Sequence, residues 1–69
     1  MEDILYEVFV SSPGKPREMF KFKASSEDDL ITEINSRYPE IYECTAVYYD
    51  KDYKRLSIRF NIVDGRVVK

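Results

Sequence analysis

The side chains that most often do chemistry in proteins are scarce in this chain of 69 residues. It contains no histidine and one cysteine, Cys44. Histidine is the commonest general base and metal ligand, and a thiol without a neighbouring base is not activated as a nucleophile. Cys44 lies within a predicted strand, so we interpret it as a small core residue. We therefore expect no enzyme activity, no metal site and no cofactor.

Two carboxylate pairs, Asp28/Asp29 and Asp50/Asp52, are the remaining candidates for acid–base or metal chemistry. The first pair opens a predicted helix, where acids complement the positive end of the helix dipole. The second pair lies in a predicted turn, and it lacks the glycine and the terminal glutamate spacing of a calcium loop. Both pairs are therefore interpreted as structural.

Alternating apolar and polar residues predict the strands that must position these side chains. Ser26 is a suitable helix cap with Asp29 three residues later, and Pro39 ends the helix near Arg37 or Tyr38. Asp64-Gly65 is a hairpin signal that precedes a short terminal strand. The predicted strands cover residues 4–10, 18–24, 42–49 and 54–63.

This order, β-β-α-β-β with a possible fifth strand, predicts an α+β fold in a single domain over residues 1–69. We expect one mostly antiparallel sheet with one helix on one face. A β-grasp-like layout and a plain pair of hairpins bridged by the helix both fit the order of elements.

One helix can cover only one face of such a sheet, so the other face is expected to be solvated. The side chains expected beneath the helix are those of Tyr6, Val8, Phe20, Phe22, Leu56, Ile58 and Phe60. Those expected on the uncovered face are Glu7, Phe9, Lys21, Lys23, Arg55, Ser57 and Arg59.

Charge and aromatic content favour binding to another protein. The net charge of −2 excludes a strongly basic nucleic-acid binder and argues against membrane binding. Residues 24–52 carry eight acids and two bases, whereas the remainder carries five acids and nine bases. Such asymmetry steers encounters with partners. Six tyrosines supply rigid contact groups for an interface.

We therefore predict a small non-enzymatic protein-binding module, an inhibitor or modulator that masks a partner, of the kind that phages and mobile elements encode. The predicted contact residues are Tyr49, Asp50, Asp52, Tyr53, Arg55, Asp28, Asp29 and Glu33. A strand edge could also pair with a second copy of the chain. The lone cysteine and the absence of a leader or membrane-spanning pattern favour the cytoplasm, which for a viral protein is that of its host.

The alternative function is binding of RNA or single-stranded nucleic acid on the uncovered sheet face. There, cations would neutralise phosphates and an aromatic ring would stack on a base. The residues predicted for this face are Phe9, Lys21, Lys23, Arg55 and Arg59.

Residues 47–58 (VYYDKDYKRLSI) resemble the acidic hairpin of PB1 domains, which are ubiquitin-like interaction modules. The order of elements is also similar to the β-grasp layout of those domains. The chain departs from the pattern at Tyr53 and Lys54, where the family has a glycine and a further acid. The resemblance implies an interaction module rather than an enzyme.

Overall fold

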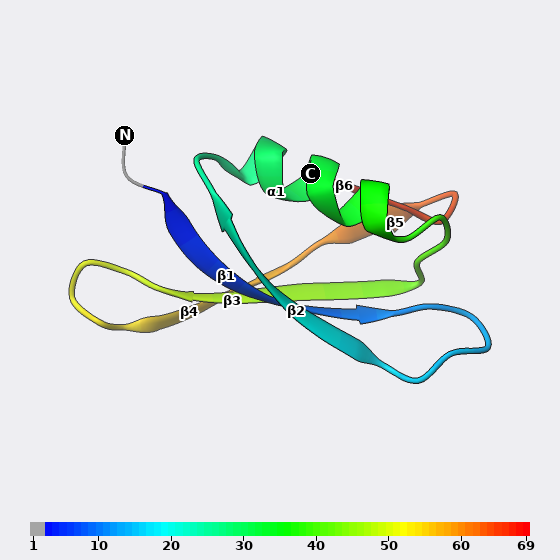
Figure 1. The fold of residues 1–69 in the computed structure, drawn as a ribbon, viewed down its shortest axis with the longest axis horizontal. Coiled ribbons are helices and arrows are strands. Elements are labelled where there is room, and N and C mark those ends of the chain that lie inside the picture. Colours follow the sequence, from blue (N-terminus) through cyan, green and yellow to red (C-terminus); the bar gives the residue numbers. More distant parts are fainter. Residues whose placement is uncertain (1–2) are drawn as a thin grey trace.

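The computed structural model describes residues 3–69 and contains two layers (Figure 1). The elements are β1 (Ile4–Ser11), β2 (Glu18–Ala24), α1 (Glu27–Arg37), β3 (Glu43–Tyr49), β4 (Arg55–Arg59), β5 (Asn61–Val63) and β6 (Arg66–Val68). Four strands form one sheet in the order β2-β1-β3-β4, and β5 and β6 form a separate hairpin. The predicted α+β fold, with an antiparallel sheet and one helix, is confirmed.

The four-stranded sheet consists of two hairpins joined at their inner strands. β1 pairs with β2, β3 pairs with β4, and β1 pairs with β3, all antiparallel. Of the two layouts left open by the sequence, the plain pair of hairpins bridged by a helix describes this arrangement.

The helix begins and ends where its sequence signals predict. The Ser26 hydroxyl accepts a hydrogen bond from the backbone N–H of Asp29 at 3.1 Å, and Glu27, Asp28 and Asp29 form an acidic first turn. The Asp29 carboxylate accepts a bond from the Ser25 hydroxyl rather than from the cap itself. Leu30 and Ile34 are the buried side chains of α1. The capping and the apolar stripe together fix which face of the helix meets the sheet.

The predicted strand over residues 54–63 is divided at Phe60, which corrects the sequence interpretation. The backbone N–H of Phe60 donates to the carbonyl of Cys44 at 3.0 Å, and β5 then leaves the four-stranded sheet. The Phe60 side chain is buried at this corner. The hairpin predicted at Asp64-Gly65 is confirmed, since Val63 pairs with Arg66 across the turn.

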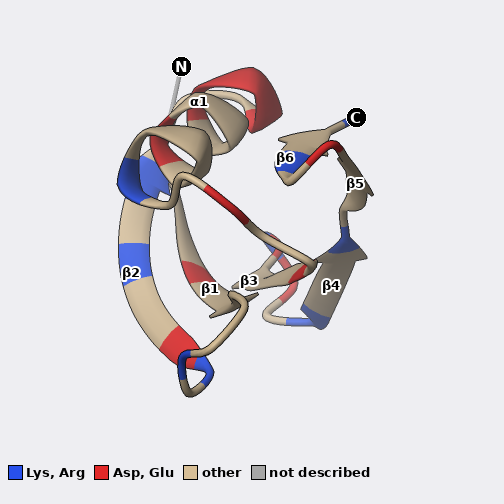
Figure 2. Cartoon of the chain, turned by 90° about the vertical axis from the view of Figure 1, so that its right-hand side faces the viewer, with Lys and Arg blue, Asp and Glu red and all other residues tan. Residues whose placement is uncertain are grey.

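The core lies between the sheet and a second layer made of α1 and the β5–β6 hairpin (Figures 1 and 2). Asn35 fastens the two parts of this layer. Its side-chain amide donates to the carbonyl of Val67 at 3.0 Å, and its side-chain oxygen accepts from the Val67 N–H at 2.8 Å. The amide of Asn35 therefore occupies the edge of β6 as a neighbouring strand would.

The helix does not shield every residue expected beneath it. Tyr6 and Val8 are buried, whereas Leu56 is 38% exposed, so its predicted burial is wrong. Leu56 lies towards the tip of the β3–β4 hairpin, which extends along the molecule's long axis beyond α1 (Figure 1). Phe60, at the opposite end of β4, packs into the core cluster that also contains Val67 of the C-terminal hairpin.

Candidate interaction surface

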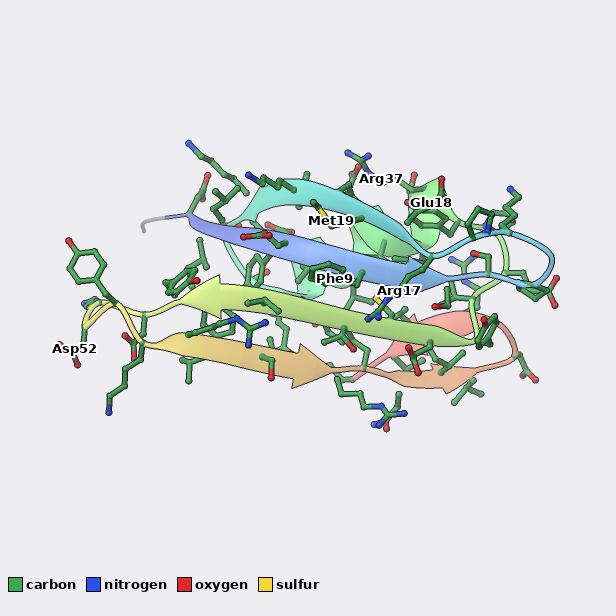
Figure 3. The ribbon with its side chains drawn as sticks, turned by 90° about the horizontal axis from the view of Figure 1, so that it is seen from below. Phe9, Arg17, Glu18, Met19, Arg37 and Asp52 are labelled. Atoms are coloured by element: carbon green, nitrogen blue, oxygen red, sulfur yellow. The ribbon has the colours of Figure 1, made fainter. Side chains whose placement is uncertain are left out.

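The sheet face opposite α1 is uncovered by any element of residues 3–69, and we call it the open face (Figure 3). Alternation along four paired strands places its side chains together. Its members are Leu5, Glu7, Phe9, Met19, Lys21, Lys23, Thr45, Val47, Tyr49, Arg55, Ser57 and Arg59. The seven residues predicted for this side all lie on it, so the predicted membership of the uncovered face is confirmed.

Strand register places most apolar side chains of the open face on the inner strands β1 and β3 and the cations on the outer strands β2 and β4. One row across the sheet reads Met19, Phe9, Thr45 and Arg59, and the next reads Lys21, Glu7, Val47 and Ser57. Lys21 and Lys23 belong to the outer strand β2, and Arg55 and Arg59 belong to the outer strand β4. Leu5, Met19 and Tyr49 are large apolar side chains exposed on this face.

The basic residues do not form one continuous patch. Two strands separate β2 from β4, which places the two pairs of cations about 14 Å apart in the sheet. Glu7 lies between them, and Glu43 is 3.8 Å from Arg59. The guanidinium of Arg17 lies over the ring of Phe9, 5.2 Å from its centroid. The residues of the nucleic-acid alternative thus share a face, but its stacking ring already has a cation on it.

At one end of the open face the two hairpins diverge and form a cleft. Pairing between β1 and β3 ends at Glu7 and Val47. The cleft beyond this point has a volume of about 940 Å³. Its lining is Asp3, Ile4, Leu5, Glu7, Val47, Tyr48, Tyr49, Asp50 and Lys51. The apolar surface of the open face therefore continues into a depression with acidic groups at its margin.

The adjacent tyrosines of β3 point to opposite sides of the sheet, as strand alternation requires. Tyr48 faces the core, where its ring lies 5.2 Å from that of Tyr6. Tyr49 faces outward, is 56% exposed, and lies opposite Arg55 in the β3–β4 ladder. The predicted contact residues Tyr49 and Arg55 therefore belong to the open face.

Asp50, Asp52 and Tyr53 lie instead at the tip of the β3–β4 hairpin. The Asp50 carboxylate accepts bonds from the N–H groups of Asp52 at 2.8 Å and of Lys54 at 3.0 Å, so Asp50 holds the turn. Asp52 projects at the tip (Figure 3). Tyr53 is 87% exposed and has a φ of 61°, in the left-handed region that favours glycine.

The acids predicted as contacts on α1 lie on the covered side of the sheet and have partners within the chain (Figure 2). Asp28 is 3.0 Å from the Lys69 ammonium, and Asp29 accepts from Ser25. Glu33 pairs with Arg37 at 2.6 Å, one helical turn later. The eight predicted contact residues therefore divide among three places: the open face, the hairpin tip and the helix.

Among the open-face residues that were not predicted as contacts, Leu5 and Met19 are the large exposed hydrophobic ones. The sequence contains the pattern that places both on this face. Leu5 alternates in phase with Glu7 and Phe9, and Met19 alternates in phase with Lys21 and Lys23. Their exposure depends on the face being bare, which the sequence pattern already indicated.

Cys44 is buried, as its place in a predicted strand indicated, and burial raises the pKa of its thiol to about 12. The thiol is therefore protonated at neutral pH. Within residues 3–69, no three or more Cys, Asp or Glu side chains gather where a metal ion could be held. No helix of the same residues is long and apolar enough to cross a membrane.

No protein-family model, no curated protein and no solved structure matches the chain. The resemblance of residues 47–58 to an interaction-module hairpin is therefore a local one.

Proposed function

We propose that the protein is a non-enzymatic binding module that contacts another protein through its open face. By covering the partner's surface it acts as an inhibitor or modulator. The observation that carries this proposal is the exposed apolar surface of the face, where Leu5 and Tyr49 lie on the inner strands β1 and β3 and Met19 lies on β2, with Lys and Arg on the two outer strands. Protein interfaces have this plan, with apolar and aromatic groups at the centre and charged groups at the rim.

The charges of the face favour an acidic partner surface. Lys21, Lys23 and Arg55 form no ion pair among the described residues. A partner with carboxylates at its rim would gain association rate and specificity from these cations. Two copies stacked face to face would instead bring like charges together, which disfavours a homodimer through the open face.

The nucleic-acid alternative has less support from the geometry. A polyanionic backbone would have to pass Glu7 between the two cationic edges. Stacking of a base on Phe9 would have to displace Arg17. These two features make a protein surface the better match to the face.

The test compares two tyrosines of similar exposure on different parts of the molecule. The tagged chain is used to capture partners from the organism that encodes it, and the affinity of the recovered protein is then measured for two variants. Tyr49→Ala is expected to weaken binding at least about tenfold, because buried aromatic anchors contribute most at interfaces. Tyr42→Ala is the control, since Tyr42 is 63% exposed but lies outside the open face.

Equal affinities of Tyr49→Ala, Tyr42→Ala and the unaltered chain would contradict the proposal, provided that circular dichroism shows both variants folded. Capture that disappears on nuclease treatment and falls steeply with added salt would favour the nucleic-acid alternative instead.

A further inference from the structure

The tip of the β3–β4 hairpin carries a side chain that the local backbone does not favour. Asp50 N–H donates to the carbonyl of Lys54 at 3.1 Å, and Tyr53 N–H donates to the carbonyl of Asp50 at 3.1 Å. A three-residue loop closed in this way needs its last residue in the left-handed conformation, where glycine is usual. Tyr53 occupies that position with a φ of 61°. A β-carbon in this conformation destabilises the folded chain.

Packing of the Tyr53 ring does not offset the cost of this conformation. The Tyr53 side chain is 87% exposed and takes no part in the core cluster or in any aromatic pair of residues 3–69. Strained residues persist where surrounding structure fixes them, and they concentrate at functional positions. The two hydrogen bonds that the Asp50 carboxylate accepts from the N–H groups of Asp52 and Lys54 fix the turn.

The hairpin is also shaped to enter a concavity. It lies at one end of the 37 Å long axis, beyond α1 and away from the β5–β6 hairpin (Figure 1). Tyr49 on one face and Leu56 on the other are both exposed along it, so both sides of the hairpin can meet a partner. The turn is ordered before binding, which lowers the entropy lost on association.

We infer that Tyr53 is an anchor that the β3–β4 hairpin inserts into a pocket of the partner protein. This inference rests on the proposed function and adds which part of the molecule enters the partner's surface. The pocket must have apolar walls for the ring and a polar group at its floor for the hydroxyl, as tyrosine anchors require. The open face would then pack on the surface beside that pocket, because Tyr49 joins the hairpin to the face.

The inference is tested by site-specific photo-crosslinking of the full chain in the organism that encodes it. The probe is p-benzoylphenylalanine, placed at Asp52 beside the anchor, at Ser57 on the open face, or at Val63 on β5 as an exposed control. Crosslinking is then repeated in a lysate of that organism, with an excess of unlabelled competitor, either the unaltered chain or Tyr53→Gly, added before irradiation. Glycine suits the left-handed turn, so this competitor is expected to remain folded.

The expected result is a discrete adduct from the Asp52 probe and none from the Val63 probe. Tyr53→Gly should need at least about a tenfold higher concentration than the unaltered chain to suppress the adduct, as loss of a hot-spot tyrosine predicts.

An adduct from the Ser57 probe with none from the Asp52 probe would overturn the anchor and leave the proposed function standing. Equal suppression by Tyr53→Gly and the unaltered chain would do the same. If neither the Asp52 nor the Ser57 probe formed an adduct, both the anchor and the proposed function would be overturned.

Discussion

The β5–β6 and β3–β4 hairpins reverse the chain in contrasting ways. The first uses Asp64 and Gly65, both with positive φ and both of residue types that tolerate it. A β-carbon added at Gly65 would lie 3.2 Å from Cγ of Glu40, so this turn is packed against the chain. The second turn places a tyrosine in the left-handed conformation and points it into solvent.

This contrast distinguishes a hairpin that stabilises the fold from one whose residues are available to contact a partner. Asn35 of α1 bonds to both backbone groups of Val67 in the first hairpin. In the second, side-chain hydrogen bonds come from its own Asp50. Substitutions in the two hairpins should therefore change stability by different amounts and, at Tyr53, in the opposite direction.

The largest expected effect is at the fastening of the β5–β6 hairpin. Asn35→Ala leaves the N–H and the carbonyl of Val67 without their partner and should lower the free energy of unfolding by about 3 kcal/mol. Urea denaturation measures the change. Asn61→Ala is the matched control, because the exposed Asn61 makes one long bond of 3.5 Å to Lys69 and should change stability by less than about 0.5 kcal/mol. Similar losses in both variants would show that Asn35 does not fasten the hairpin.

The packed turn of the β5–β6 hairpin should be destabilised by a single added methyl group. Gly65→Ala combines an unfavourable φ of 77° with the close approach of Glu40, and we expect a loss of about 2 kcal/mol. Gly14→Ala separates the two causes, since Gly14 has a φ of 73° but nothing within 4 Å of the added carbon. Thermal unfolding of both variants gives the difference. If Gly14→Ala lowered the free energy of unfolding as much as Gly65→Ala does, the contact with Glu40 would contribute nothing to the loss of stability.

Removal of the carboxylate that holds the exposed turn should have a smaller cost. Asp50→Ala eliminates the bonds to the N–H groups of Asp52 and Lys54, which water can then solvate, so we expect a loss of about 1 kcal/mol. Amide hydrogen exchange should speed up at Asp52 and Lys54 while the core amides of β1 keep their protection. Faster exchange throughout the sheet would contradict a local role for Asp50.

The smallest expected change in stability is at Tyr53, and it should be a gain rather than a loss. Tyr53→Gly relieves the left-handed strain but adds backbone entropy to the unfolded chain, so we expect a net gain of about 0.5 kcal/mol. Calorimetry should show a midpoint about 2–4 °C higher. A lower midpoint would mean that the Tyr53 ring stabilises the folded chain. The exposed tyrosine would then not lower stability in exchange for binding a partner.

Much of the fold follows from local sequence signals. Ser26, Pro39 and Asp64-Gly65 act within a few residues of themselves, so their outcomes agree with prediction. The break at Phe60 depends on a bond to Cys44 and on the position of the second layer, which no local pattern contains. The exposure of Leu56 has the same origin, because the alternation that places it on the covered face does not say how far the cover extends.

The candidate surface was predictable to a similar degree. Alternation alone assigned Arg55 to the uncovered face, and the Asp50-Lys51-Asp52 turn located the tip. The partners of the helix acids were not predictable, because Lys69 is distant in sequence from Asp28. The position of Arg17 over Phe9 likewise depends on how the loop before β2 folds back over the strand.

The bonds between Asn35 and Val67 also bear on self-association. A β-strand recruits another chain through peptide groups that are left free along its side. On β6 those of Val67 are occupied, on the side away from β5, by a carboxamide from a helix, and a carboxamide cannot be extended into a further strand. At Val67 this side of β6 is thereby closed to pairing with a strand from another chain.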